Sequence, residues 1–213
     1  MVGNDPIVYE DFFSIQEIES MDDVCRKLGT DIDYHAPDGN NFSGELLGKF
    51  RYITPENAPL IYQILDRVLP LFPREVKINE IFYHNIYRPW DIHTDYERKY
   101  PGSNPAGLFC VPLEDIDSRT IFFDQRAKYN DFWRYKESHD VLEDCLSEDF
   151  WNEHLDFCWP EDRQYLSSSY PLTPYHRKGQ CIFIPRDLFH SSDNFHDRCP
   201  VPKRFLQVII DYV

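Results

Sequence analysis

From about Val76 to the end of the chain, apolar residues recur with a period of two in short runs separated by turn-forming residues. Side chains of a strand alternate between its two faces, so this period is typical of strands with one buried face. The expected strands are Ile78 to Tyr87, Leu108 to Leu113, Arg119 to Asp124, Gln180 to Pro185 and Arg204 to Tyr212. No helix alternates with them, and the pattern therefore favours an antiparallel barrel or jelly roll. We expect the second and third of these strands to pair across an acidic turn, residues 114–117.

The first 75 residues have a different pattern, typical of helices. Ser14 and Glu17 form a predicted capping box before a helix with one apolar face. A second helix is expected to start at Thr54 as N-cap, with Pro55 at its first position. The prediction is a single domain, 1–213, that is mainly β with flanking helices. Residues 1–75 would be a helical support region, and 76–213 the jelly-roll core.

The core is interrupted by a long insertion, residues 125–177, rich in Trp, Tyr and acidic residues. Segments of this length often lie over the open end of a barrel, so we expect a lid or a substrate wall. The alternative is a surface elaboration with no role in binding. Four aromatic residues are candidates to line an apolar pocket or to belong to the core: Trp133, Trp151, Trp159 and Tyr175.

Charge and cysteine usage narrow the classes of partner and compartment. The formal net charge is −15, with no run of Lys and Arg, so we do not expect binding to a nucleic-acid backbone. The six Cys residues form no CxxC pair, which favours reduced thiols inside the cell. The sequence contains neither a signal-peptide pattern nor an apolar stretch of membrane-spanning length. We therefore expect a soluble cytoplasmic protein that does not bind membranes.

The segment from Tyr87 to Asp95 places His93 and Asp95 two residues apart at the end of a predicted strand. At a strand end this spacing brings both side chains to one face. His154 and Asp156 have the same spacing, but in a stretch of helical character where such residues point apart. A third candidate ligand, His190, follows the strand that ends at Pro185. Two His and one carboxylate on one side of a metal leave other positions open, as in non-haem Fe(II) enzymes.

Arg204 opens the last apolar strand, where an inward-facing charge requires a partner. A guanidinium binds a carboxylate in a bidentate manner. With metal ligands on neighbouring strands, the expected partner is the distal carboxylate of a small diacid whose other end chelates the metal. Lys203 has the opposite parity and is expected on the surface.

Together these residues resemble the Fe(II)/2-oxoglutarate-dependent oxygenases. The resemblance rests on His93-x-Asp95, His190 with the following Ser-Ser-x-Asn, and Arg204 at the start of the last strand, and it covers about Ile81 to Tyr212. It is nearest to the phytanoyl-CoA and prolyl hydroxylase-like branches and to short oxygenases of some bacteriophages. It implies a double-stranded β-helix, or jelly-roll, core with N-terminal helices packed outside.

The resemblance also implies roles for single residues. His93, Asp95 and His190 would hold Fe(II), and Arg204 would bind the C5 carboxylate of the cosubstrate 2-oxoglutarate. Members often carry the basic residue nearer the distal His, which leaves Arg198 as the alternative to Arg204. Tyr87 and Thr120 are further candidates for cosubstrate binding. No catalytic residue is expected beyond the metal centre.

The implied reaction uses O2 to hydroxylate a C–H bond of a small molecule or an amino-acid side chain, releasing succinate and CO2. A carboxylate at Asp95 favours hydroxylation over halogenation, because related halogenases have a small residue there. Two alternatives remain: a non-catalytic jelly-roll binding module, and a cupin-like metalloenzyme that does not use 2-oxoglutarate.

Overall fold

The structure, a computed structural model, describes residues 1–29, 31–36, 42, 44–95, 104–127, 139–196, 198–199 and 201–213. Within these ranges the strands form a seven-stranded sheet, ordered β1-β7-β5-β9-β4-β3-β2, and a two-stranded sheet of β6 and β8. All the pairings are antiparallel. The strands are β1 (Ile7–Tyr9), β2 (Ile32–His35), β3 (Leu46–Ile53), β4 (Val76–Ile86), β5 (Pro105–Pro112), β6 (Thr120–Arg126), β7 (Cys181–Ile184), β8 (Leu188–Ser192) and β9 (Lys203–Tyr212).

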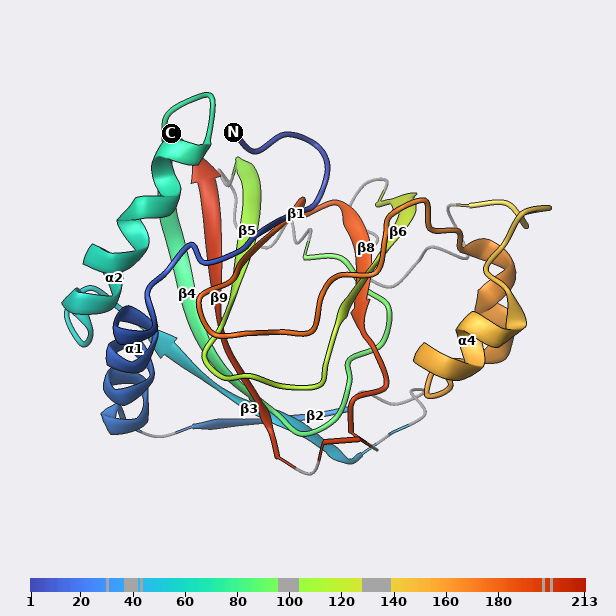
Figure 1. Ribbon diagram of the computed structural model, residues 1–213, viewed down its shortest axis with the longest axis horizontal. Helices are drawn as coiled ribbons and strands as arrows, with labels where there is room; N and C mark the ends of the chain where they lie inside the picture. The colour runs from blue at the N-terminus through green and yellow to red at the C-terminus, as the bar shows by residue number, and fades with distance from the viewer. Residues whose placement is uncertain are drawn as a thin grey trace.

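The last strand, β9, lies between β4 and β5 in the centre of the larger sheet. Its alternating side chains separate two environments. Leu206, Val208 and Ile210 are buried in the main hydrophobic core, where they meet α1 (Ile15–Lys27) and α2 (Pro59–Leu65). Figure 1 shows these two helices on the outer side of β4 and β9. The opposite face of β9 is turned toward β6 and β8, and this face lines the cavity described below.

The smaller sheet has a core of its own on its outer side. Ile121 and Phe123 of β6 pack with Phe189 of β8 against the helix α4 (Glu148–His154). Figure 1 shows α4 on the far side of the molecule from α1 and α2. The two sheets with helices outside them form the predicted jelly roll, mainly β with flanking helices.

Two helix starts can be compared with the sequence. The capping box is confirmed, because the Ser14 hydroxyl accepts from the Glu17 N–H at 3.2 Å while the Ser14 N–H donates to the Glu17 carboxylate. The expected start at Thr54 is wrong. Thr54 and Asn57 cap each other across a turn, and the helix begins at Pro59, whose missing N–H suits a first helical position. A 3-10 helix, η1 (Asp66–Leu71), follows.

The expected pairing of the second and third predicted strands is also wrong. The first of them, β5, pairs with β7 and β9, whereas β6 pairs with β8 in the other sheet. The connection between them crosses from one layer to the other, and it is held midway by a bridge between Ile116 and His176. Residues 1–75 are more than a helical support, because they also supply β1, β2 and β3 to the larger sheet.

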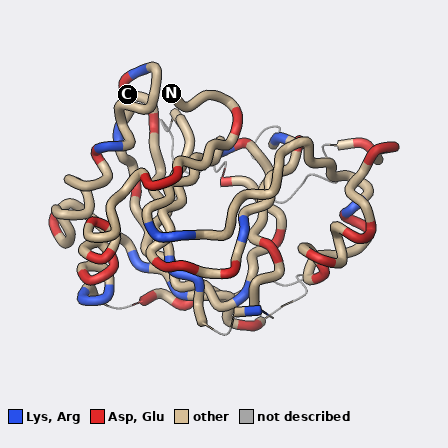
Figure 2. Tube along the Cα trace, viewed as in Figure 1, with Lys and Arg blue, Asp and Glu red and all other residues tan. Residues whose placement is uncertain are grey.

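The described part of the insertion contains α4 and the 3-10 helix η2 (Pro160–Tyr165). Trp151 is buried in the outer core beside β6, Trp159 is 43% exposed, and Tyr175 lies against the guanidinium of Arg119. Trp133 lies outside the described residues. Across the described ranges, no helix has the length and apolar character needed to cross a membrane. In the view of Figure 2, acidic residues gather along α1 and α4.

Candidate metal centre and cosubstrate cavity

The two predicted His ligands are joined through the backbone. His93 and His190 form an isolated antiparallel bridge, in which each N–H donates to the other residue's carbonyl, at 3.0 and 2.9 Å. Residues directly opposite each other in such a bridge point their side chains to the same face. The imidazole centroids are therefore only 4.5 Å apart. His190 lies within β8 rather than beyond a strand end, so a regular element positions the pair.

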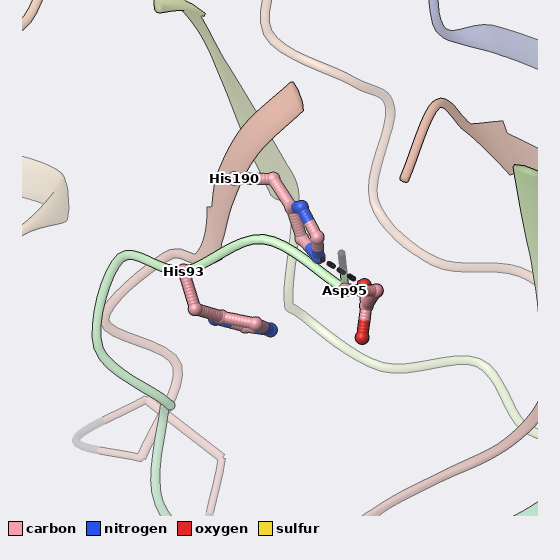
Figure 3. Close-up of side chains that lie close together, drawn as sticks. All are labelled: His93, Asp95 and His190. Carbon is pink, nitrogen blue, oxygen red and sulfur yellow. Dashed lines mark ion pairs between the residues drawn. The ribbon is translucent and has the colours of Figure 1, made fainter. Parts of the chain in front are cut away.

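Asp95 completes the cluster from the same segment as His93. Its carboxylate Oδ2 lies 3.2 Å from His190 Nε2 (Figure 3). One possible ligand atom from each of His93, Asp95 and His190 falls within 4.8 Å of the others. Among the described residues, this is the group of His, Cys and carboxylate side chains with the spacing of a metal site. The structure thus brings together the three residues predicted as metal ligands.

The backbone fixes which nitrogen each imidazole presents. His93 Nδ1 lies 2.6 Å from the Asp91 carbonyl oxygen, and His190 Nδ1 lies 3.0 Å from that of Leu188. A carbonyl oxygen only accepts, so in each ring Nδ1 carries a proton and donates it, which leaves Nε2 facing the cluster. Burial, followed by the neighbouring His190, lowers the pKa of His93 to about 4, which keeps its ring neutral at pH 7. Neutral imidazoles with Nε2 presented are metal ligands.

Asp95 is held as a carboxylate with one oxygen occupied. Burial alone would raise its pKa, but interactions with His190, His93 and the Arg186 guanidinium lower it to about 2. Gln207 Nε2 donates to Oδ1 at 2.9 Å, and Arg186 Nε donates to the Asp95 backbone carbonyl at 2.9 Å. The other oxygen, Oδ2, is buried without a hydrogen bond. This oxygen faces His190 Nε2 at 3.2 Å, so possible ligand atoms of two residues lie side by side, an arrangement that fits a cation bound by both.

A second contact orients Gln207 itself. Its Oε1 accepts a hydrogen bond from His84 Nε2 at 3.1 Å. Since Gln207 donates to Asp95 with its amide nitrogen, the side chain connects His84 to the carboxylate in one defined orientation. Burial lowers the pKa of His84 to about 4, so this ring is neutral at pH 7. Hydrogen bonds of this kind fix the direction in which a ligand faces the metal.

The triad opens into a cavity of about 600 Å³ between the two sheets. The size is in the range of small-molecule sites. The inner face of the larger sheet forms one wall of the cavity, and the triad lies on the opposite side of the cavity. No described residue of the insertion 125–177 lines it. The lining residues are Tyr34, Phe50, Tyr52, Glu80, Phe82, His84, Ile86, Trp90, His93, Asp95, Leu108, Cys110, Thr120, Ile184, Arg186, His190, Ser191, Ser192, Lys203, Phe205, Gln207 and Ile209.

Lys203 is buried in this cavity, contrary to the expectation of a surface residue. It is 3% exposed, its ammonium donates to Ser192 Oγ at 3.1 Å, and it lies near the rings of Phe195 and Phe205. Burial lowers its pKa. In the described ranges no carboxylate lies within ion-pairing distance of this ammonium. A buried cation of this kind is costly unless an anion binds beside it.

Arg204 is not where the sequence predicted it. Arg204 follows Lys203 on β9, so its side chain points to the opposite face of the sheet, away from the cavity and toward α1. There Nε and Nη2 bind Glu114 at 2.9 and 2.7 Å, and Nη1 binds Asp22 at 2.8 Å. The expected contact with a cosubstrate is corrected accordingly, because the protein's own carboxylates satisfy the guanidinium. Arg198, the alternative, pairs with Asp193 and Asp117 and does not line the cavity.

Of the two further candidates for cosubstrate binding, only Thr120 lies in the cavity lining. Thr120 lines the cavity, is 5% exposed, and has its hydroxyl 3.0 Å from His176 Nε2. Tyr87 is 36% exposed and is not part of the lining. His154 and Asp156 lie outside the triad, as expected, with Asp156 accepting from Asn194.

Gln207, Arg186 and Lys203 were not predicted as residues of the site. Gln207 carried a usable signal, because a polar residue in the middle of an apolar strand indicates a face with a polar function. Gln207 lies four residues after Lys203 on β9, so the two side chains share one face of the strand and Arg204 lies on the other.

Comparison with solved structures supports the architecture. The carbocyclase SnoK from nogalamycin biosynthesis, described as non-haem and α-ketoglutarate-dependent, has a TM-score of 0.59 at 15% identity, over 97% of this chain and 79% of that one. HygX from Streptomyces hygroscopicus, with nickel and 2-oxoglutarate bound, has a TM-score of 0.57 at 12% identity, over 98% and 83%. EctD from S. alaskensis, with 2-oxoglutarate and 5-hydroxyectoine, has 0.53 at 16%, over 98% and 72%. The chain has their fold. No protein-family model and no curated protein matches the sequence.

Proposed function

We propose that this protein is an Fe(II)/2-oxoglutarate-dependent dioxygenase. The observation that carries the proposal is the pairing of a two-His, one-carboxylate cluster with a buried lysine in one cavity. The cluster provides neutral nitrogen and ionised oxygen ligands on one side of a metal. The Lys203 ammonium provides a positive charge that can bind one carboxylate of a dicarboxylate whose other end reaches the metal. The fold shared with enzymes described as 2-oxoglutarate-dependent supports the same reading.

In this proposal His93, Asp95 and His190 hold the iron, and Lys203 takes the role first predicted for Arg204. Its ammonium, with the Ser192 hydroxyl beside it, would bind the distal carboxylate of 2-oxoglutarate. Thr120 lies directly opposite Ser192 in the pairing of β6 and β8, so its hydroxyl is placed at the same end of the cavity. A buried charge-assisted contact of this kind gives both affinity and orientation.

Bound iron and 2-oxoglutarate would supply oxidation of a C–H bond by O2, with release of succinate and CO2. The chain's own part is to bind and orient. Gln207 and Arg186 fix Asp95, the backbone carbonyls of Asp91 and Leu188 fix the imidazoles, and the apolar walls exclude water. Hydroxylation of a small molecule or an amino-acid side chain is the proposed outcome, and Asp95 as a ligand supports it over halogenation.

Assignment to the phytanoyl-CoA and prolyl hydroxylase-like branch stays a prediction. It rests on Ser191, Ser192 and Asn194 after the distal His and on the strand sequences around them. A cytoplasmic location and the absence of nucleic-acid binding also stay predictions from composition. The insertion 125–177 as a lid remains a proposal without support from the cavity lining.

Calorimetry with Ni(II), a redox-inert substitute for iron, tests the proposal. We expect 2-oxoglutarate to bind the Ni(II)-loaded protein, and glutarate, which lacks the 2-oxo group, to bind at least about tenfold more weakly because it cannot chelate. Equal binding of the two diacids would contradict the chelation that the proposal requires. Binding of Ni(II) without any diacid would favour the cupin-like metalloenzyme. Binding of neither would favour the non-catalytic module.

A further inference from the structure

Five aromatic side chains line one side of the cavity, and folding leaves all of them partly open to solvent. They are Tyr34, Phe50, Tyr52, Phe82 and Trp90, and we call them the aromatic wall. Tyr52 is 47% exposed, and the other four are half-buried. Large rings are the side chains that gain most from burial. Apolar surface left open in one place is typical of a binding site.

The strand register makes this wall continuous. Tyr52 lies opposite Phe82, and Phe50 opposite His84, in the pairing of β3 and β4. The ring centroids of Tyr52 and Phe82 are 4.7 Å apart, and those of Phe50 and Phe82 are 6.0 Å apart. A sheet supports these rings, so the surface they offer is broad and pre-formed.

The wall also reaches the metal ligands. Tyr34 on β2 stacks on Trp90 with the centroids 4.5 Å apart and the planes at 20°. Trp90 in turn lies 5.5 Å from the ring of His93. A molecule lying along the wall would therefore end beside the metal site, which is the position that a substrate of the proposed oxygenase requires.

Of the four charged residues that line the cavity, Asp95 belongs to the metal cluster and Arg186 pairs with Asp211, while Lys203 and Glu80 lie beyond the ends of the wall. Lys203 pairs with Ile86 at one end of β4, and Glu80 lies two residues beyond Phe82 at the other. An anion placed against the rings would lose hydration without a charged partner there. A cation would gain only the weak attraction that aromatic faces provide at solvent-exposed sites, whereas a flat apolar ring would gain both burial and stacking. Lys203 is proposed to be occupied by the cosubstrate, so it is not available to an anionic substrate.

We infer that the primary substrate carries an uncharged, planar aromatic ring system, which the aromatic wall binds next to the metal. This inference rests on the proposed function for its location beside bound 2-oxoglutarate, and it narrows the substrate from any small molecule to this class. Tyr52 and Phe82 would be the residues that determine this specificity at the solvent end.

The test uses four probes of nearly equal size: 2-naphthol, its saturated analogue decahydro-2-naphthol, the anion 2-naphthoate and the cation 2-naphthyltrimethylammonium. Each is titrated calorimetrically into the full chain, first as purified and then loaded with Ni(II) and 2-oxoglutarate. Binding of the metal and cosubstrate is recorded in the same samples. We expect 2-naphthol to bind most tightly of the four in both states.

Variants locate the binding. Tyr52→Leu and Phe82→Leu keep apolar volume but remove a ring, and each is expected to weaken 2-naphthol binding about threefold to tenfold. Trp159→Leu removes a ring of similar exposure, 43%, outside the cavity and should leave the affinity unchanged. Tyr52 is exposed, so its variant tests the wall even if Phe82→Leu fails to fold.

The outcomes separate this inference from the proposed function. Equal affinity for the saturated analogue, tighter binding of either ion, or no effect of Tyr52→Leu would overturn the inference. Failure of every probe to bind while Ni(II) and 2-oxoglutarate bind would overturn it and leave the oxygenase proposal intact. Selective 2-naphthol binding without metal or cosubstrate binding would support the wall and contradict the oxygenase.

Discussion

Gln207 Nε2 donates a hydrogen bond to Asp95 Oδ1 at 2.9 Å, and this contact leaves Oδ2 as the oxygen that faces His190. The two residues come from different elements, since Gln207 is on β9 and Asp95 follows β4 by several residues. The central strand of the larger sheet thereby sets the direction of a ligand on the facing segment.

Replacing Gln207 should weaken metal binding without abolishing it. Gln207→Leu removes the donor to Asp95 Oδ1, so the carboxylate loses its fixed direction. Loss of such an outer contact typically costs about tenfold to 100-fold in metal affinity. Calorimetry with Ni(II) measures the effect, and Gln164→Leu, at a half-buried glutamine on η2 outside the cavity lining, is the matched control. Unchanged affinity in Gln207→Leu would show that the contact does not orient the ligand.

Lys203 and Arg204 are adjacent but face opposite sides of β9, so the same substitution should have different effects at the two positions. Lys203→Met should weaken 2-oxoglutarate binding to the Ni(II)-loaded protein by about tenfold to 100-fold, the usual loss for a hydrogen bond to a charged group. Metal affinity should stay close to that of the parent, because Lys203 does not touch the triad.

Arg204→Met is the control for this substitution. It leaves Glu114 without its guanidinium partner, whereas Asp22 still pairs with Arg26, so we expect it to lower the free energy of unfolding by about 1 to 3 kcal/mol while 2-oxoglutarate affinity is retained. Urea unfolding measures the first effect and calorimetry the second. The reverse pattern, with cosubstrate binding lost in Arg204→Met and kept in Lys203→Met, would restore the original sequence-based assignment.

His84 should make the stability of the metal-free protein depend on pH. Its pKa is about 4 in the folded chain and about 6.5 when unfolded, so the unfolded chain binds more protons between these values. The free energy of unfolding therefore falls as pH drops from 6.5 toward 4. Between pH 7 and pH 5 the contribution of His84 amounts to about 2 kcal/mol. His93 adds a similar contribution.

Urea unfolding of the parent and of His84→Gln at pH 7 and pH 5 measures this contribution. The variant should lose about 2 kcal/mol less than the parent over that interval, because its amide does not titrate. His35→Gln, at an exposed histidine on β2, should behave like the parent. Parallel pH profiles for the parent and His84→Gln would contradict the burial-driven lowering of the His84 pKa.

Local pattern was enough to predict the jelly-roll class, the capping box at Ser14 and the three residues of the triad. The fold class depends on strand periodicity and the capping box on hydrogen bonds within one turn. His93 and Asp95 were predicted from a spacing of two residues at a strand end, and His190 from its place after a later strand and from the family resemblance. Which face of β9 lines the cavity was not predicted correctly. Each face of β9 has apolar residues and begins with a basic one, Lys203 on one face and Arg204 on the other. Which of the two faces the cavity depends on Glu114 and Asp22, which bind Arg204 and are distant from it in sequence.

Other features were not predictable from the sequence for the same reason. The pairing of β5 with β7 and β9 is set by closure of the jelly roll, whereas a short acidic connection suggested a local hairpin. The aromatic wall is assembled from β2, β3 and β4, and two of these strands lie in a region whose sequence was interpreted as helical. Side chains brought together by sheet order have no shared local signature.

The most direct test of the central claim is an anaerobic titration of the protein with Fe(II) and then 2-oxoglutarate, followed by visible absorption. An oxoacid chelated to Fe(II) produces a weak charge-transfer band. We predict this band in the parent, its loss in Asp95→Ala, and a higher 2-oxoglutarate concentration for half-saturation in Lys203→Met than in Arg204→Met. Fe(II) bound to the parent with no band at saturating 2-oxoglutarate would contradict the assignment of this cavity as a 2-oxoglutarate site.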